Sequence, residues 1–171
     1  ALGNGTAINV NSNATLNVAS NNNVGLVTLA SGTLSGSGTL TTTGVNVSGS
    51  SNTISLNLAN GGSFINTGTL TLSGSNTFAS GLIVLNGGTL NASNNYALGN
   101  GTSINVNITA TLNVGSNNNV GAITLASGTL SGSGTLTTTG VNVSGSSNTI
   151  SLNLINSGGL TNTGALALSG S

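Results

Sequence analysis

Two series of apolar residues recur along this chain at nearly the same spacing, and this periodicity restricts the possible folds more than any other feature. One series mostly follows Thr-Leu and Thr-Ile dipeptides at intervals of 16 to 22 residues, and the second lies between them at intervals of 18 to 21 residues. Both series indicate that the chain returns to the same place about every 19 residues. We predict that both face the core; their members are Ile8, Leu16, Val27, Leu34, Val45, Ile54, Phe64, Leu70, Ile83, Leu90, Ile104, Leu112, Ile123, Leu130, Val141, Ile150, Leu160 and Leu166.

A longer repeat contains this short one. Ala1–Ser75 matches Ala97–Ser171 at 62 of 75 positions, an offset of 96 residues, and Thr28–Leu58 recurs without change as Thr124–Leu154. We therefore divide the chain into a first unit of about five turns, residues 1–96, and a second, incomplete copy, residues 97–171. We expect one continuous solenoid that is a piece of a longer array.

The segments around the predicted core positions alternate apolar and polar residues, as short strands with one buried face do. Examples are Ile8–Val10, Thr15–Val18 and Ile54–Leu58, and Ser-Gly, Gly-Gly and Asn-Gly pairs that favour turns lie between such segments. Strands this short cannot bury their apolar face alone, but successive turns of a coil can share one core. We therefore predict an all-β fold, a parallel β-solenoid that forms a right-handed β-helix with about 19 residues per turn.

The chain has no Asp, Glu, Lys, Arg, His or Cys in 171 residues, and this absence excludes most chemistry. General acid–base catalysis requires a side chain that titrates near the working pH, and a serine nucleophile requires a neighbouring base. Zinc and calcium ligands and the cations that hold nucleic acid are also missing. We therefore expect no enzyme activity, no cofactor, no metal and no nucleic-acid partner. The longest apolar run, Leu82–Leu85, predicts no membrane span, because a spanning helix needs roughly 20 apolar residues.

One stretch of the sequence resembles a known repeat. Gly68–Phe78 reads G-T-L-T-L-S-G-S-N-T-F, Gly81–Leu90 reads G-L-I-V-L-N-G-G-T-L, and Ala97–Gly99 reads A-L-G. This stretch resembles the autotransporter-associated β-strand repeat of bacterial passenger domains, with partial matches at Gly164–Ser171 and Ala1–Gly3. The resemblance implies a right-handed β-helix outside a Gram-negative cell, used in adhesion, aggregation or presentation of another domain. It brings no catalytic residues, and typical members carry some charged residues, whereas this chain has none.

Periodicity, composition and resemblance together predict a structural protein. Sheet edges at the ends of a solenoid are normally blunted by charges, Pro or caps, and no charged residue or Pro is present here. We therefore predict a repeat segment of an extracellular filament, stalk or autotransporter-like passenger at the bacterial cell surface. Its expected partner is itself, through end-to-end or lateral stacking, or further repeats of the same chain.

Two alternatives stay open. An adhesin could bind surface glycans through its Asn, Ser and Thr side chains, and Phe64, Phe78 and Tyr96 are the aromatic residues available to such a site. Ice binding is the least favoured alternative, because it requires an outward Thr-x-Thr in nearly every turn. The runs Thr41–Thr43 and Thr137–Thr139 occur once per 96 residues, and we expect other turns to present Ser, Asn or Ala.

Two further motifs have structural interpretations. Gly36–Gly38 and its copy Gly132–Gly134 could suggest a phosphate-binding loop, but no Lys follows them, so we predict tight turns. The runs Asn21–Asn23 and Asn117–Asn119 are predicted to stack their side chains into amide ladders between turns.

Overall fold

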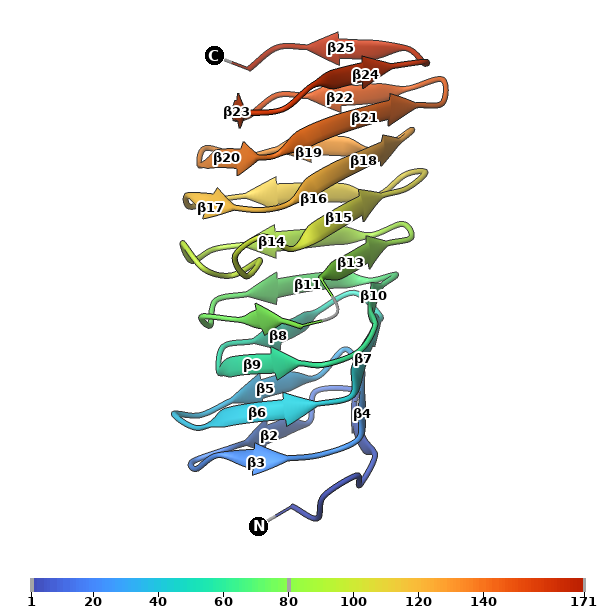
Figure 1. Ribbon diagram of the computed structural model, residues 1–171. Helices are drawn as coiled ribbons and strands as arrows, with labels where there is room; N and C mark the ends of the chain where they lie inside the picture. The colour runs from blue at the N-terminus through green and yellow to red at the C-terminus, as the bar shows by residue number, and fades with distance from the viewer. Residues whose placement is uncertain (1, 80, 171) are drawn as a thin grey trace.

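The chain coils into a β-solenoid of nine turns. The computed structural model describes residues 2–79 and 81–170, and within these ranges it contains strands and turns but no helix. Ala1, Ser80 and Ser171, which belong to the predicted units or the repeat motif, lie outside the described residues. Figure 1 shows the strands stacked from the N-terminal end at the bottom to the C-terminal end at the top, in a right-handed coil. The predicted fold class is confirmed.

Two parallel sheets of nine strands run the length of the solenoid, and each turn contributes one strand to each sheet. Sheet A contains β1 (Ile8–Asn11), β4 (Leu26–Ala30), β7 (Gly44–Ser48), β10 (Phe64–Asn66), β13 (Leu82–Leu85), β15 (Ser103–Val106), β18 (Ala122–Ala126), β21 (Gly140–Ser144) and β24 (Leu160–Asn162). Sheet B contains β2 (Thr15–Asn17), β5 (Thr33–Ser35), β8 (Asn52–Ile54), β11 (Thr69–Leu72), β14 (Thr89–Ala92), β16 (Thr111–Val114), β19 (Thr129–Ser131), β22 (Asn148–Ile150) and β25 (Leu166–Leu168).

The third side of the coil is divided into two shorter sheets. Sheet C contains β3 (Asn22–Asn23), β6 (Thr39–Thr42), β9 (Asn57–Asn60) and β12 (Thr77–Phe78), and sheet D contains β17 (Asn118–Asn119), β20 (Thr135–Thr138) and β23 (Asn153–Asn156). Between these sheets, residues 93–102 form a loop in place of a third strand, and Ala97 and Leu98 of this loop are fully buried. The Ala-Leu-Gly motif thus fills the core where the third sheet is interrupted.

The core is a set of apolar columns that pass from turn to turn. Fourteen of the eighteen predicted core residues are buried, and paired residues such as Val45 and Phe64 lie at the same place in adjacent turns. The rings of Phe64 and Phe78 meet edge to face with centroids 5.3 Å apart. Paired residues in sheets A and B are 18 to 22 positions apart, for example Val27 with Val45 and Leu90 with Leu112. The predicted period falls within this range.

The predicted core is wrong at one residue and weaker at the ends. Leu160 is 50% exposed, whereas its counterpart in the first unit, Phe64, is completely buried. Leu160 lies in the last described turn, where no further turn covers it. Ile8 and Leu16 in the first described turn and Leu166 in the last are half-buried, because each has a neighbouring turn on one side only. All three still pack against the core. Burial here depends on a neighbouring turn and not on residue type.

The predicted alignment of sheet B also needs a correction of two residues. Ile54 pairs with Leu72 and not with Leu70, and Ile150 pairs with Leu168 and not with Leu166. The inward position opposite Leu70 is occupied by Asn52. The sequence pattern assigned that position to an apolar residue, because a buried polar side chain is recognised only when its hydrogen-bond partners are known.

The repeat provides a matched test of turn-to-turn burial. Leu72 and Leu168 are equivalent leucines in the two units, but Leu72 is fully buried and Leu168 is 67% exposed. We expect Leu72→Ala to lower the free energy of unfolding by about 2–5 kcal/mol, the range for buried leucines. Leu168→Ala should lower it by less than about 1 kcal/mol. Urea unfolding followed by circular dichroism measures both, and equal losses would contradict the described packing.

Candidate functional surfaces

A row of threonines covers the outer face of sheet B. Each of the first eight strands of this sheet carries at least one Thr that points away from the core, and only β25 has Ala167 in its place. We call this surface the threonine face; it consists of Thr15, Thr33, Thr53, Thr69, Thr71, Thr89, Thr111, Thr129 and Thr149. In strands β2, β5, β14, β16 and β19, a Ser or Asn follows two residues after the Thr on the same side.

The pairing of the strands arranges these threonines in two columns. One column joins Thr15, Thr33, Thr53 and Thr71, and the other joins Thr69, Thr89, Thr111, Thr129 and Thr149. The columns overlap at β11, which contributes both Thr69 and Thr71. Where the first column continues, Asn91 and Asn113 stack, and Asn113 Nδ2 donates a hydrogen bond of 2.9 Å to Asn91 Oδ1.

A single outward Thr thus recurs in nearly every turn of sheet B, whereas an outward Thr-x-Thr occurs in this sheet only at β11 and other strands present Ser or Asn there, as expected. In the runs Thr41–Thr43 and Thr137–Thr139, Thr42 and Thr138 are buried in sheets C and D and their hydroxyls donate to the backbone, while the residues on either side face outward. The array lies instead in the Thr-Leu and Thr-Ile dipeptides, whose Thr faces outward because the residue after it faces inward. The same dipeptides that marked the core therefore also marked this surface.

A shallow groove on the third side surrounds the exposed aromatic side chain. Phe64 and Phe78 are buried, whereas Tyr96 is 62% exposed in the loop of residues 93–102. The groove has a volume of about 240 Å³ and is lined by Asn95, Tyr96, Asn117, Asn118, Asn119 and Thr137. Of the three aromatic residues considered for a glycan site, the structure thus places only Tyr96 on the surface.

Asn118 fixes the base of this groove. Its Oδ1 accepts a hydrogen bond of 3.1 Å from Leu98 N, and its Nδ2 donates to the carbonyls of Asn94 and Ser116 at 3.0 and 3.1 Å. Asn119 is exposed beside it and pairs with Thr137 of the next turn. The predicted amide ladder is wrong for these Asn runs, because the two runs lie in turns far apart and neighbour Leu and Thr residues.

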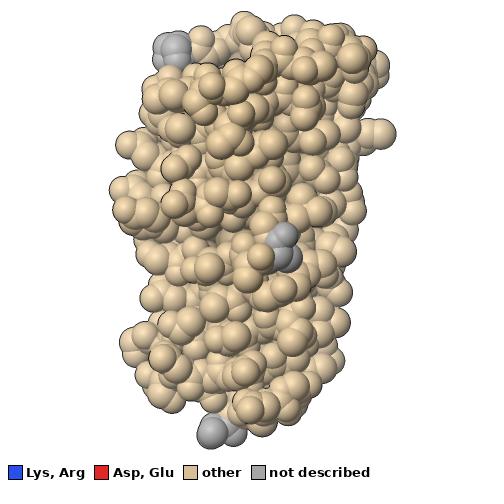
Figure 2. Space-filling view, viewed as in Figure 1, with Lys and Arg blue, Asp and Glu red and all other residues tan. Residues whose placement is uncertain are grey.

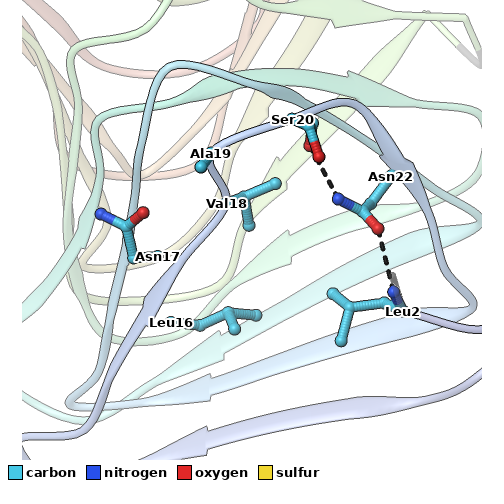
Figure 3. Close-up of a pocket in the computed structure, with 7 residues that line it drawn as sticks. All are labelled: Leu2, Leu16, Asn17, Val18, Ala19, Ser20 and Asn22. Atoms are coloured by element: carbon cyan, nitrogen blue, oxygen red, sulfur yellow. Dashed lines mark hydrogen bonds between the residues drawn. The ribbon is translucent and has the colours of Figure 1, made fainter.

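Each end of the described solenoid carries a pocket, of mixed polar and apolar lining at the N-terminal end and mainly apolar at the C-terminal end. At the N-terminal end a cavity of about 290 Å³ is lined by Leu2, Leu16, Asn17, Val18, Ala19, Ser20 and Asn22 (Figure 3). Leu2 N donates a hydrogen bond of 2.9 Å to Asn22 Oδ1, which holds the N-terminal segment across this opening. At the C-terminal end a second cavity of about 240 Å³ is lined by Ile150, Leu152, Leu154, Leu168 and Gly170.

Buried asparagines, which the sequence analysis missed, link successive turns. Asn52 Oδ1 accepts from Gly32 N of the preceding turn at 3.1 Å, and its Nδ2 donates to Ser48 O at 2.7 Å and to Thr69 O of the next turn at 3.0 Å. Its counterpart Asn148 makes the equivalent three contacts. The available signal was the Asn-Thr-Ile triplet, in which Asn occupies an inward position of an alternating strand.

The Gly36–Gly38 segment forms the predicted tight turn. Gly36 has φ of +125°, and a Cβ on either Gly36 or Gly38 would collide with the backbone of Val18 or Ser20 in the turn below. The copy at Gly132 and Gly134 is constrained in the same way. These glycines permit close stacking of successive turns.

The surface carries no side-chain charge, since the sequence has none; in the view of Figure 2 neither acidic nor basic residues appear. In the part of the chain that the structure describes, no helix has the length and hydrophobicity needed to cross a bilayer.

Comparison with protein-family models, with curated proteins and with solved structures finds no match to this chain. The interpretation of its surfaces therefore depends on their geometry and chemistry.

Asn52 can be tested against an exposed asparagine. Asn52→Ala leaves Gly32 N, Ser48 O and Thr69 O without this partner, and each buried group left unpaired costs about 1–3 kcal/mol. We therefore expect a clear loss of unfolding free energy in urea. Asn17→Ala removes an exposed side chain bonded to Ser35 Oγ at 3.4 Å, and should change stability by no more than about 0.5 kcal/mol. Similar losses for both variants would refute the linking role of Asn52.

Proposed function

We propose that this chain is a structural segment of an extracellular filament, stalk or autotransporter-like passenger at a bacterial cell surface. The observation that carries the proposal is the uninterrupted parallel pairing of sheets A and B through all nine turns, with an unpaired strand edge at each described end and apolar residues open at the C-terminal one. A rod of stacked turns provides reach, and an open end can be covered by a further turn. We assign it no catalytic role, because no side chain can act as a general base near neutral pH.

The resemblance to the autotransporter-associated repeat supports this assignment. The similar stretch begins at β11 and spans β12, β13 and β14, which together form slightly more than one complete turn, and its Ala-Leu-Gly continuation supplies the buried Ala97 and Leu98. Ser80 of this stretch lies outside the described residues. Gly74 and Gly88 of the stretch lie against the backbone of Leu56 and Gly68 in the turn below, where a Cβ would collide.

Self-association through the ends would give this rod cohesion. The C-terminal end exposes Leu160 and Leu168, which are 50% and 67% accessible, together with the unpaired edges of β24 and β25. Neither end carries a charged side chain that would repel a second copy. Cohesion of this kind depends on apolar contact and backbone pairing, so salt should have little effect on it.

Electron microscopy of the purified chain tests this self-association. We expect unbranched filaments one solenoid wide that persist in roughly 1 M salt, where the Debye length is only about 3 Å. Leu168→Lys places a charge at the open end and should shorten or abolish the filaments. Asn142→Lys, on the outer face of β21 in sheet A, adds the same charge away from the open edge; it is the matched control and should leave them intact. A wild-type chain that stays monomeric at high concentration would rule out polymerisation of this segment.

A second candidate function is adhesion to a neutral glycan at the Tyr96 groove. An exposed aromatic ring beside amide and hydroxyl groups suits a sugar, whose C–H face packs on the ring while its hydroxyls form hydrogen bonds. Asn95, Asn117 and Asn119 are exposed around Tyr96. The absence of cations disfavours acidic sugars, because no positive charge can pair with a carboxylate or sulfate.

A glycan array with purified protein examines this second function. We expect Tyr96→Ala and Asn119→Ala to lose binding to whichever neutral glycan the wild type retains. Asn23→Ala is the matched control, because Asn23 is the counterpart of Asn119 in the first unit and does not line the groove around Tyr96. Absence of wild-type binding, or equal losses in the Asn23 and Asn119 variants, would exclude the groove as a glycan site.

A further inference from the structure

We propose that the threonine face of sheet B binds ice. Each threonine presents a hydroxyl, which both donates and accepts hydrogen bonds, and a methyl group, which orders nearby water without binding it. A regular array of both groups can hold water molecules in a repeating pattern that merges with a crystal surface. The ligand is therefore crystalline water, a surface and not a soluble molecule.

The spacing of the array is set by the backbone. Successive threonines in a column are one sheet spacing apart, roughly 4.8 Å, and outward residues along a strand are two residues apart, roughly 6.6 Å. One Thr per strand continues this spacing over eight consecutive strands, first in the column from Thr15 to Thr71 and then in the column from Thr69 to Thr149, and the two columns lie side by side only at β11. Both distances are close to repeats of oxygen atoms on ice surfaces, so water bound at one threonine is in register with water bound at the next.

The hydroxyls of the threonine face are available to water. None of its nine threonines, all of them described, uses its side-chain oxygen in a hydrogen bond within the protein. Elsewhere the hydroxyls of Thr42, Thr67, Thr138 and Thr163 donate to backbone carbonyls. The threonines of sheet B are thus distinguished from these four by their contacts as well as by their number.

Sheet A provides the contrasting face. Its outward residues in register are mixed in type, and one column runs through Asn46, Ile65, Val84, Asn105 and Thr124. Bulky Ile and Val side chains interrupt any hydroxyl pattern on that side. Of the two sheets that run the full length of the solenoid, sheet B alone carries the repeating pattern, and we therefore assign ice binding to that sheet.

Thermal hysteresis and the growth of ice crystals in a solution of the purified chain test this proposal. We expect the wild type to depress the freezing point below the melting point and to shape growing crystals. Thr111→Tyr places a bulky ring in the middle of the array and should remove most of the hysteresis at equal protein concentration. Thr124→Tyr, in the adjacent turn but on the outer face of sheet A, is the matched control and should retain it.

A variant that is expected to gain hysteresis separates an effect on ice binding from an effect on folding. Ala167 is exposed in β25 and pairs with Thr149, so Ala167→Thr extends the second column to the ninth strand and should increase hysteresis. Ala126→Thr, on sheet A, should not. Circular dichroism and a thermal melt establish that each variant is folded.

Three outcomes would overturn the assignment. The first is a folded wild type without hysteresis and without retention in growing ice. The second is an equal loss in the Thr111 and Thr124 variants. The third is sedimentation showing that wild type associates side by side and that Thr111→Tyr separates the copies, because the threonine face would then be a contact between copies of the chain.

Discussion

The structure depends on parallel backbone pairing between one turn and the next. An isolated turn consists of strands of two to five residues, which cannot form a core on their own. When turns stack, each strand gains hydrogen bonds above and below, and its inward side chains complete a column with those of its neighbours. Leu160 shows the consequence, because it is half exposed in the last described turn while Phe64, its counterpart, is buried in the interior. Core membership is thus a property of position along the stack.

The same stacking also generates the surfaces. A side chain that faces outward in one turn lies directly beside its paired residue in the next, so any residue type that recurs in the sequence becomes a continuous row. The threonine face arises in this way from the repeated Thr-Leu and Thr-Ile dipeptides. The loop of residues 93–102 has the opposite effect, since it interrupts the third sheet and brings Tyr96 to the surface beside Asn119. Regularity therefore makes the array, and a local departure from it makes the groove.

Uncharged composition gives these surfaces their character. Without ionic side chains the rod relies on apolar contact, backbone pairing and amide or hydroxyl hydrogen bonds, all of which salt screens weakly. A filament, a neutral glycan and ice are partners that such groups can recognise. The proposals are compatible with one another, because they use different parts of the molecule: the two ends, the third side and the outer face of sheet B.

The sequence by itself determined the all-β solenoid, its period and most of its core, because alternation and periodicity are local properties that survive without coordinates. The tertiary structure alone decided the register of sheet B, where Asn52 takes an inward position that is acceptable only because three backbone groups in successive turns bond to it. It also decided which threonines form an array, since Thr42 lies inside whereas Thr53 lies outside. The side of a strand that faces the core and the register of its pairing both depend on neighbouring turns. A two-residue shift in register leaves the alternating pattern of the strand unchanged, but it changes every residue that lies beside it in the next turn.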